Sequence, residues 1–128
     1  MALKVSSTVI DSLAITAEQA APHECCGILL GHAGEISGAL PADNVHPSPE
    51  THFEIDPRTL IEAHRRARAG GPAIVGYYHS HPRGPAAPSA TDRAMAAGDG
   101  MAWAIIGPDA ITWWRDTPTG FVPLSLGD

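Results

Sequence analysis

The 128-residue sequence has only two cysteines, and they are neighbours, Cys25 and Cys26. Adjacent cysteines do not cross-link separate segments, which excludes a disulfide framework, and they lack the CxxC spacing of a zinc ribbon or knuckle. We expect both to be small buried side chains on a strand. A second interpretation places Cys26 in the wall of a functional site, because it lies two residues after Glu24 and so on the same strand face.

Positive charge and long apolar runs are also scarce. Eight Lys and Arg residues oppose 14 Asp and Glu residues, a formal net charge of −6. A surface that follows phosphates needs the opposite sign, so nucleic-acid binding is not expected. No apolar run reaches the length of a membrane-spanning helix, and Asp11 interrupts the N-terminal apolar stretch before it could act as a secretory signal. We therefore expect a cytoplasmic protein that binds neither nucleic acid nor membranes.

The sequence is long enough to bury one hydrophobic core, with 44% hydrophobic and 17% charged residues. It contains no internal repeat and no low-complexity linker, so we expect a single domain over residues 1–128. Helical spacing of apolar residues and capping signals predict helices, and short apolar or alternating runs predict strands. The expected helices are 6–20, 56–70 and 89–96; the expected strands are 24–30, 35–40, 52–55, 73–79, 101–106, 110–114 and 121–126. The pattern favours an α/β three-layer sandwich, a mixed and mostly antiparallel sheet flanked by helices.

His79 and His81 are the most informative pair of residues. They end a predicted strand at positions i and i+2, so both imidazoles point to one face and can bind one cation. Catalytic zinc usually has three protein ligands and a water molecule, and Asp92 is the candidate for the third. The alternative is that these are ordinary strand histidines satisfied by hydrogen bonds.

Ser89 and Asp92 also have two interpretations. They lie one helical turn apart, so their hydroxyl and carboxylate face the same side of a short helix that follows the loop after His81. The same Ser-x-x-Asp spacing is a capping box. The two roles are compatible, because a capping serine can still face a metal.

Glu24 is a candidate acid/base. A metal-activated water needs a group that takes its proton and passes it to a leaving amine, and glutamate is a usual choice. A carboxylate at the start of an apolar strand can equally be an ordinary solvated strand end. His23, beside Glu24, is the one remaining histidine that could reach such a cleft.

Together these motifs resemble the JAMM (MPN+, Mov34/JAB) metallopeptidases. The resemblance rests on residues 75–82 (VGYYHSHP), on Ser89 and Asp92 downstream, and on 24–27 (ECCG) with 30–31 (LG) upstream. It implies a cytidine-deaminase-like MPN fold and one zinc ion per chain, bound by His79, His81 and Asp92. It also implies that Glu24 holds the catalytic water and that Ser89 polarises the scissile carbonyl.

The compact chain is similar to the small stand-alone prokaryotic members of that family. The implied reaction is hydrolysis of an amide or isopeptide bond at the C-terminus of a ubiquitin-like or sulfur-carrier protein that ends in Gly-Gly. A zinc deaminase is excluded, since the sequence lacks the H-x-E and P-C-x-x-C motifs. A non-catalytic MPN scaffold is the remaining alternative, although such domains resemble the family with a broken ligand set and the set here is complete.

Overall fold

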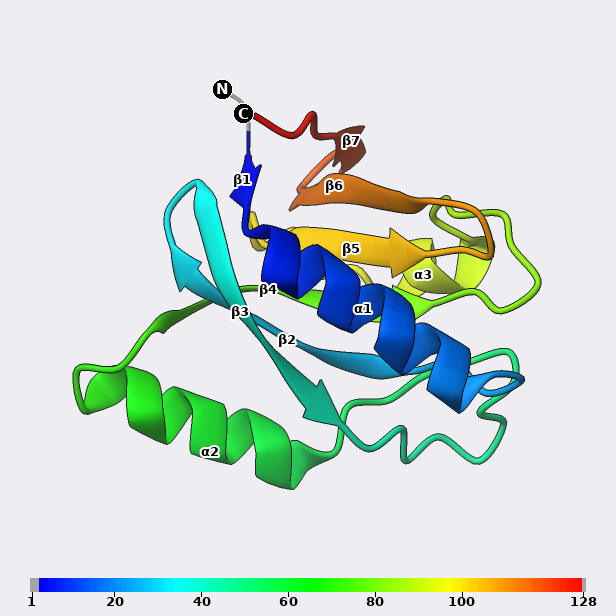
Figure 1. Cartoon of the computed structure of the whole chain (residues 1–128), viewed down its shortest axis with the longest axis horizontal. Coiled ribbons are helices and arrows are strands. Elements are labelled where there is room, and N and C mark those ends of the chain that lie inside the picture. The colour runs from blue at the N-terminus through cyan, green and yellow to red at the C-terminus, as the bar shows by residue number, and fades with distance from the viewer. Residues whose placement is uncertain (1–2, 128) are drawn as a thin grey trace.

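The computed structural model describes residues 3–127, which form one seven-stranded sheet in the order β1-β3-β2-β4-β5-β6-β7 with three helices packed on it (Figure 1). The elements are β1 (Lys4–Val5), α1 (Ser7–Ala20), β2 (Cys26–His32), β3 (Glu35–Ala42), α2 (Pro57–Arg68), β4 (Ala73–Ser80), α3 (Ala90–Met95), β5 (Ala102–Ile106), β6 (Ile111–Thr117) and β7 (Gly120–Pro123).

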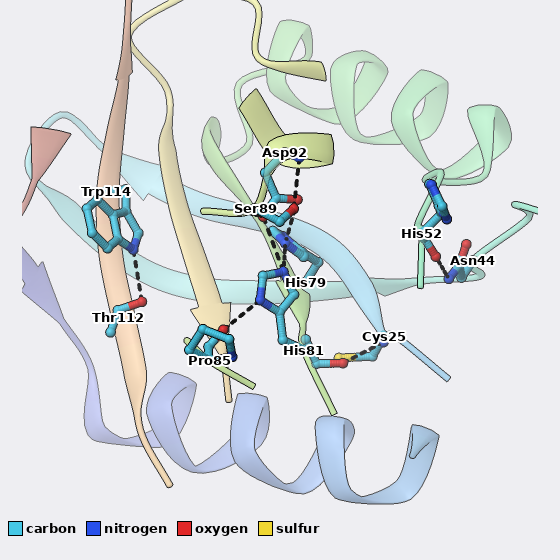
Figure 2. A network of polar contacts seen from close by, with 11 residues as sticks. Cys25, Asn44, His52, His79, His81, Pro85, Ser89, Asp92, Thr112 and Trp114 are labelled. Atoms are coloured by element: carbon cyan, nitrogen blue, oxygen red, sulfur yellow. Dashed lines mark hydrogen bonds and ion pairs between the residues drawn. The ribbon is translucent and has the colours of Figure 1, made fainter. Parts of the chain in front are cut away.

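The sheet is mixed. The pairs β1–β3 and β4–β5 are parallel and the other neighbouring strands are antiparallel. In Figure 2, α1 lies on one side of the sheet, and α2 and α3 lie on the other. The predicted fold class, a mostly antiparallel mixed sheet between helices, is confirmed.

Local signals set the ends of the two long helices. The Ser6 hydroxyl accepts a hydrogen bond from the amide of Val9 and so caps α1. Asp56 caps α2 in the same way and Pro57 occupies its first position, where no intrahelical N–H bond is lost. Three arginines in the last turn of α2 complement the negative end of the helix dipole.

The two faces of the sheet have different interiors. The face under α1 carries the larger core, which includes Leu13 of the helix, Leu29 of β2 and Tyr78 of β4. The opposite face carries a smaller cluster of Cys26, Phe53 and Trp103. Because side chains alternate along a strand, a buried Tyr78 on the α1 side requires that the next residue, His79, point to the α2 and α3 side.

Several predicted boundaries were wrong. The strand predicted from residue 24 begins at Cys26, so Glu24 lies two residues before it. The predicted strand 52–55 is only an isolated bridge between Asn44 and Ile55. The strand predicted at 110–114 extends to Thr117, the one predicted to 126 ends at residue 123, and the two-residue β1 was not predicted. Within residues 3–127, no helix is both long and apolar enough to cross a membrane.

Candidate metal centre

The pairing of β2 with β4 brings Glu24 to the two motif histidines. Cys26 lies opposite His79 in the antiparallel register. The pairing continues past the start of β2, because the Ser80 amide donates to the Cys25 carbonyl at 3.0 Å and the Cys25 amide donates to the Ser80 Oγ at 2.8 Å. The next pair outward is therefore Glu24 and His81.

The side chains of His79, His81 and Asp92 converge at one point (Figure 2). The Nε2 atoms of His79 and His81 are 3.0 Å apart. The Asp92 carboxylate places Oδ1 3.1 Å from His79 Nε2 and Oδ2 3.2 Å from His81 Nε2. The sequence prediction that α3 turns Asp92 toward the histidine pair agrees with this geometry.

The turn after β4 fixes the tautomer of His81. Its Nδ1 lies 2.8 Å from the carbonyl oxygen of Pro85, which can only accept, so Nδ1 carries the proton. In the neutral ring, Nε2 then presents a lone pair to the centre, as a metal ligand must. Gly84 makes the turn possible: its φ of +63° is a conformation that favours glycine, and its amide donates to the His81 carbonyl.

His79 is held by packing. Its side chain is 1% exposed and stacks on the Phe53 ring with centroids 4.3 Å apart. Burial lowers the pKa of His79, which the Asp92 hydrogen bond partly opposes. The imidazole is therefore held neutral, the form that binds metals.

Asp92 is positioned by the start of its own helix. The Ser89 hydroxyl accepts from the Asp92 amide and Asp92 Oδ2 accepts from the Ser89 amide, both at 3.0 Å, which is a reciprocal capping box. The end of α3 is tied down by the buried Asp116, whose carboxylate accepts from the amides of Ala97 and Gly98. The capping interpretation of Ser89 and Asp92 is thus confirmed, and it coexists with the inward position of Asp92.

The ionisable groups of the centre shift one another's pKa values. Burial alone would raise the pKa of Asp92, but hydrogen bonds to His79 and His81 hold it far below its usual range. For His81, burial lowers the pKa, while the Asp92 hydrogen bond, the Pro85 carbonyl and two carboxylate charges raise it overall. Asp92 is therefore an anion at neutral pH.

Glu24 completes the constellation. It is 7% exposed, and its carboxylate lies with the His79 and His81 nitrogens in a cluster of ligand atoms within 4.8 Å of one another. Burial raises the pKa of Glu24 to about 7; His81 lowers it and Asp92 raises it. A general acid/base works best when its pKa is near the operating pH. The solvated-strand-end interpretation of Glu24 was wrong, because the side chain is buried.

A groove of about 290 Å³ gives access to the centre. Glu24 and His81 line it together with Ser89, with the loop residues Glu50 and Thr51 and with the 82–88 loop. A larger cavity of about 610 Å³ lies between α1 and the β5–β6 turn, but it contains none of the four converging side chains. The chemistry therefore belongs to the smaller groove.

The sequence offered three more candidates beside Glu24, and the structure places them differently. His23 is exposed and belongs to neither the cluster nor the groove. Cys25 packs in the α1 core, which confirms its expected place as a small buried side chain. Cys26 is buried in the small cluster with Phe53 and Trp103, and it does not line the groove. Burial raises the pKa of its thiol to about 12.

Sequence reasoning missed four residues that shape the centre: Asn44, Phe53, Pro85 and Asp116. Each acts through a long-range contact, and none belongs to a motif with fixed spacing. Asn44 lies between predicted strands, and Phe53 lies in the predicted strand 52–55. Neither prediction gave a signal for the contact that the residue makes. Asp116 had a weak signal, because it is a carboxylate at the end of an apolar strand.

The donor set fits a zinc ion. Ligands at 2.0–2.1 Å in a tetrahedron are about 3.3 Å apart, close to the 3.0–3.2 Å separations here. Two imidazoles and one carboxylate are a recurrent catalytic set, and a second carboxylate nearby, that of Glu24, suits an acid/base. Fold and centre together agree with the JAB-type metal site that the sequence resemblance implies.

Comparison with known proteins identifies the family. Residues 6–116 match the model of the prokaryotic homologues of the JAB domain, so the chain belongs to this family. It is 34% identical over 113 residues to a desampylase from Haloferax volcanii, covering 84% of this chain and 81% of the relative. It is also 42% identical over 72 residues to a probable TtuB-protein conjugate cleaving protease from Thermus thermophilus, covering 56% of this chain and 48% of the relative.

Solved structures agree on the fold. A solution structure from Desulfitobacterium hafniense has a TM-score of 0.84 at 28% identity, covering 98% of this chain and 91% of the other. A JAB1/MPN domain protein from Archaeoglobus fulgidus has a TM-score of 0.67 at 17% identity and covers 98% of both chains. A structure of a JAMM metalloprotease-like zinc site has a TM-score of 0.62 at 16% identity, with full coverage of both chains. The last two, at such low identity, support the fold alone.

Proposed function

We propose that this protein is a zinc-dependent metallopeptidase that hydrolyses an amide or isopeptide bond at the C-terminus of a ubiquitin-like or sulfur-carrier protein. The observation that carries the proposal is the position of the buried Glu24 carboxylate beside the converging donors of His79, His81 and Asp92. Binding alone would not need a carboxylate with a pKa near neutrality at that point.

One zinc ion per chain is proposed, with His79 Nε2, His81 Nε2 and the Asp92 carboxylate as its protein ligands. When bound, zinc would polarise a carbonyl oxygen and lower the pKa of a water molecule toward ~7. The fold favours the forms of both histidines that bind zinc. The Pro85 carbonyl fixes the tautomer of His81, and burial keeps His79 neutral.

Glu24 performs both proton transfers. Its carboxylate takes a proton from the attacking water as the new carbon–oxygen bond forms. The protonated carboxyl then gives that proton to the amide nitrogen as the carbon–nitrogen bond breaks, so the products are a carboxylic acid and an amine. A pKa of about 7 allows one group to accept and then donate near neutral pH.

Ser89 stabilises the negative charge that develops on the carbonyl oxygen. Its Oγ already accepts from the Asp92 amide, but a hydroxyl has one proton to donate besides its lone pairs. That proton is free for a substrate oxygen, because the capping bond uses only the acceptor side. Ser89 lines the groove with Glu24, so both can reach the same bond.

The proposed substrate follows from the groove and from the relatives. The groove is small, about 290 Å³, and proline-rich on one side, so a thin tail such as Gly-Gly fits better than bulky side chains. The relatives named above are a desampylase and a probable TtuB-protein conjugate cleaving protease. A ubiquitin-like protein with a Gly-Gly C-terminus joined to an amine is the class common to these observations.

Cleavage of a defined conjugate tests the proposal. A ubiquitin-like protein ending in Gly-Gly is linked through an isopeptide bond to a lysine peptide, and a matched conjugate carries Val-Val instead. Zinc-loaded protein is expected to release the Gly-Gly conjugate, to stop after chelation and to recover when zinc is restored. If zinc binds fully but no conjugate is cleaved, the protein is an MPN scaffold. Equal cleavage of unrelated unfolded peptides would contradict the proposed substrate.

A further inference from the structure

Asn44 makes four hydrogen bonds from one side chain. Its Nδ2 donates to the Glu24 carbonyl at 3.0 Å and to the His52 carbonyl at 2.9 Å. Its Oδ1 accepts from the amides of His46 at 3.1 Å and Glu54 at 3.0 Å. The orientation of the amide is unambiguous, because one end faces two carbonyls and the other faces two N–H groups.

The bond to Glu24 matters because Glu24 lies outside the sheet. The last bonded pair is Cys25 and Ser80, and the amide and carbonyl of Glu24 bond to another part of the chain instead of to β4. Two contacts from the 44–54 loop hold the Glu24 main chain: the Glu24 amide donates to the Pro49 carbonyl at 2.7 Å, and the Glu24 carbonyl accepts from Asn44. The N–H and the C=O of Glu24 are therefore both held by one loop. Asn44 is the side chain of that loop that bonds to the Glu24 main chain.

The same side chain secures the other end of the loop. The His52 carbonyl that accepts from Asn44 belongs to the peptide before Phe53, and Phe53 stacks on the His79 ring (Figure 2 shows the Asn44–His52 bond). Asn44 thus joins the segment that carries Glu24 to the segment that packs against His79, although it touches neither the Glu24 carboxylate nor the donor atoms of the centre.

We propose that Asn44 is a positioning residue that fixes the distance between the Glu24 carboxylate and the His79–His81–Asp92 centre by bridging the main chains of Glu24 and His52. Its catalytic consequence rests on the proposed function, whereas its structural consequence does not. A displacement of about 1 Å at a reacting group can cost about 10²-fold in rate, so loss of the bridge affects kcat without removal of any reacting group.

Two substitutions separate the donor and acceptor halves of the bridge. Asn44→Ala removes all four hydrogen bonds. Asn44→Asp keeps the size and the acceptor oxygen for the His46 and Glu54 amides but cannot donate to the Glu24 and His52 carbonyls. If the acceptor half were enough, Asn44→Asp would behave like the parent protein.

His46→Ala is the matched control. It removes the ring stacked on His52 and the Nδ1 acceptor for the Ser48 amide, so it loosens the same loop. It leaves the Asn44 bridge intact, because only the backbone amide of His46 bonds to Asn44. General loosening of the loop should therefore appear in His46→Ala as well, and loss of the bridge should not.

Steady-state kinetics on zinc-loaded protein with a Gly-Gly conjugate give the first test. We expect kcat to fall about 10–100-fold in Asn44→Ala and in Asn44→Asp, with KM changed less than kcat and zinc content unchanged. His46→Ala should retain kcat within a few fold. A parent-like kcat in Asn44→Asp, or an equal loss in His46→Ala, would overturn the proposal.

A double-mutant cycle with Glu24→Gln identifies the route of the effect. If Asn44 acts through the Glu24 carboxylate, Asn44→Ala should add nearly nothing to the loss in Glu24→Gln. Additive losses would overturn the proposal. Hydrogen exchange of the 22–28 peptide in folded protein needs no substrate: protection of the Glu24 amide should fall in Asn44→Ala and Asn44→Asp but persist in His46→Ala. An inactive parent refutes the proposed function, while unchanged protection refutes the bridge.

Discussion

Cys26 on β2 lies directly opposite His79 on β4, and this register places Glu24 across from His81. The side-chain period of a strand is two residues, so a slip of one residue would turn His79 toward the α1 core and remove it from Asp92. The strands on either side leave little freedom for a slip, because β2 and β4 are both interior strands with buried residues on both faces. The register of the sheet therefore fixes the direction of both histidines and brings Glu24 beside His81.

The three proposed zinc ligands make the first prediction. Replacing His79, His81 or Asp92 by alanine should abolish zinc binding, because three protein ligands are the usual minimum for a catalytic site. Elemental analysis of purified protein measures this as zinc per chain. Full occupancy in His79→Ala and His81→Ala would rule out this centre as the zinc site.

Ser89 makes the second prediction, since its two roles differ in what they affect. Ser89→Ala should keep its zinc and slow turnover about 10²–10³-fold if the hydroxyl stabilises the oxyanion. Loss of the helix cap should also cost about 0.5–2 kcal/mol in the free energy of unfolding. Turnover and unfolding are measured on the same variant. Normal turnover per folded molecule would leave Ser89 with its capping role alone.

The buried thiols make a prediction about pH. Burial raises the pKa of Cys25 above its usual 9.0 and that of Cys26 to about 12, so neither thiol should react with a thiol reagent at pH 8 until the protein unfolds. The unfolded state loses the Cys26 proton first, near pH 9. The contribution of the protonated Cys26 thiol to the free energy of unfolding is therefore full below pH 9 and falls as pH rises toward 12.

Comparison with Cys26→Ala isolates that contribution from other groups that titrate in the same range. The free energy of unfolding of the parent protein should decrease more steeply between pH 9 and 12 than that of the variant. Parallel pH profiles, or rapid labelling of folded protein at pH 8, would show that Cys26 is accessible.

Much of the fold was predictable because its signals are local. The caps of Ser6 and Asp56 and the proline at the start of α2 define both long helices within one or two residues. The start of β2 was not predictable, since apolar character alone cannot show where the ladder begins. The two-residue β1 depends on pairing with a distant strand and has no local pattern.

The centre was predictable where its residues belong to one spacing rule. His79 and His81 alternate on a strand, and Ser89 and Asp92 share a helix face, so local geometry brought each pair together. The contacts that tie these pairs to each other were not predictable. Pro85, Phe53 and Asn44 act through loop conformations that depend on the assembled sheet, and the burial of Glu24 depends on a loop that begins about 20 residues later.

The central claim is that Glu24 moves the proton in a zinc-dependent hydrolysis, and Glu24→Gln tests it most directly. The variant keeps the size and an acceptor oxygen but cannot take a proton. Single-turnover cleavage, equilibrium binding of a Gly-Gly conjugate and zinc content are measured beside the parent protein. We predict full zinc content, retained substrate affinity and a rate lower by about 10²–10⁴-fold, toward the upper end because one carboxylate serves both transfers. Cleavage within a few fold of the parent rate would contradict the account.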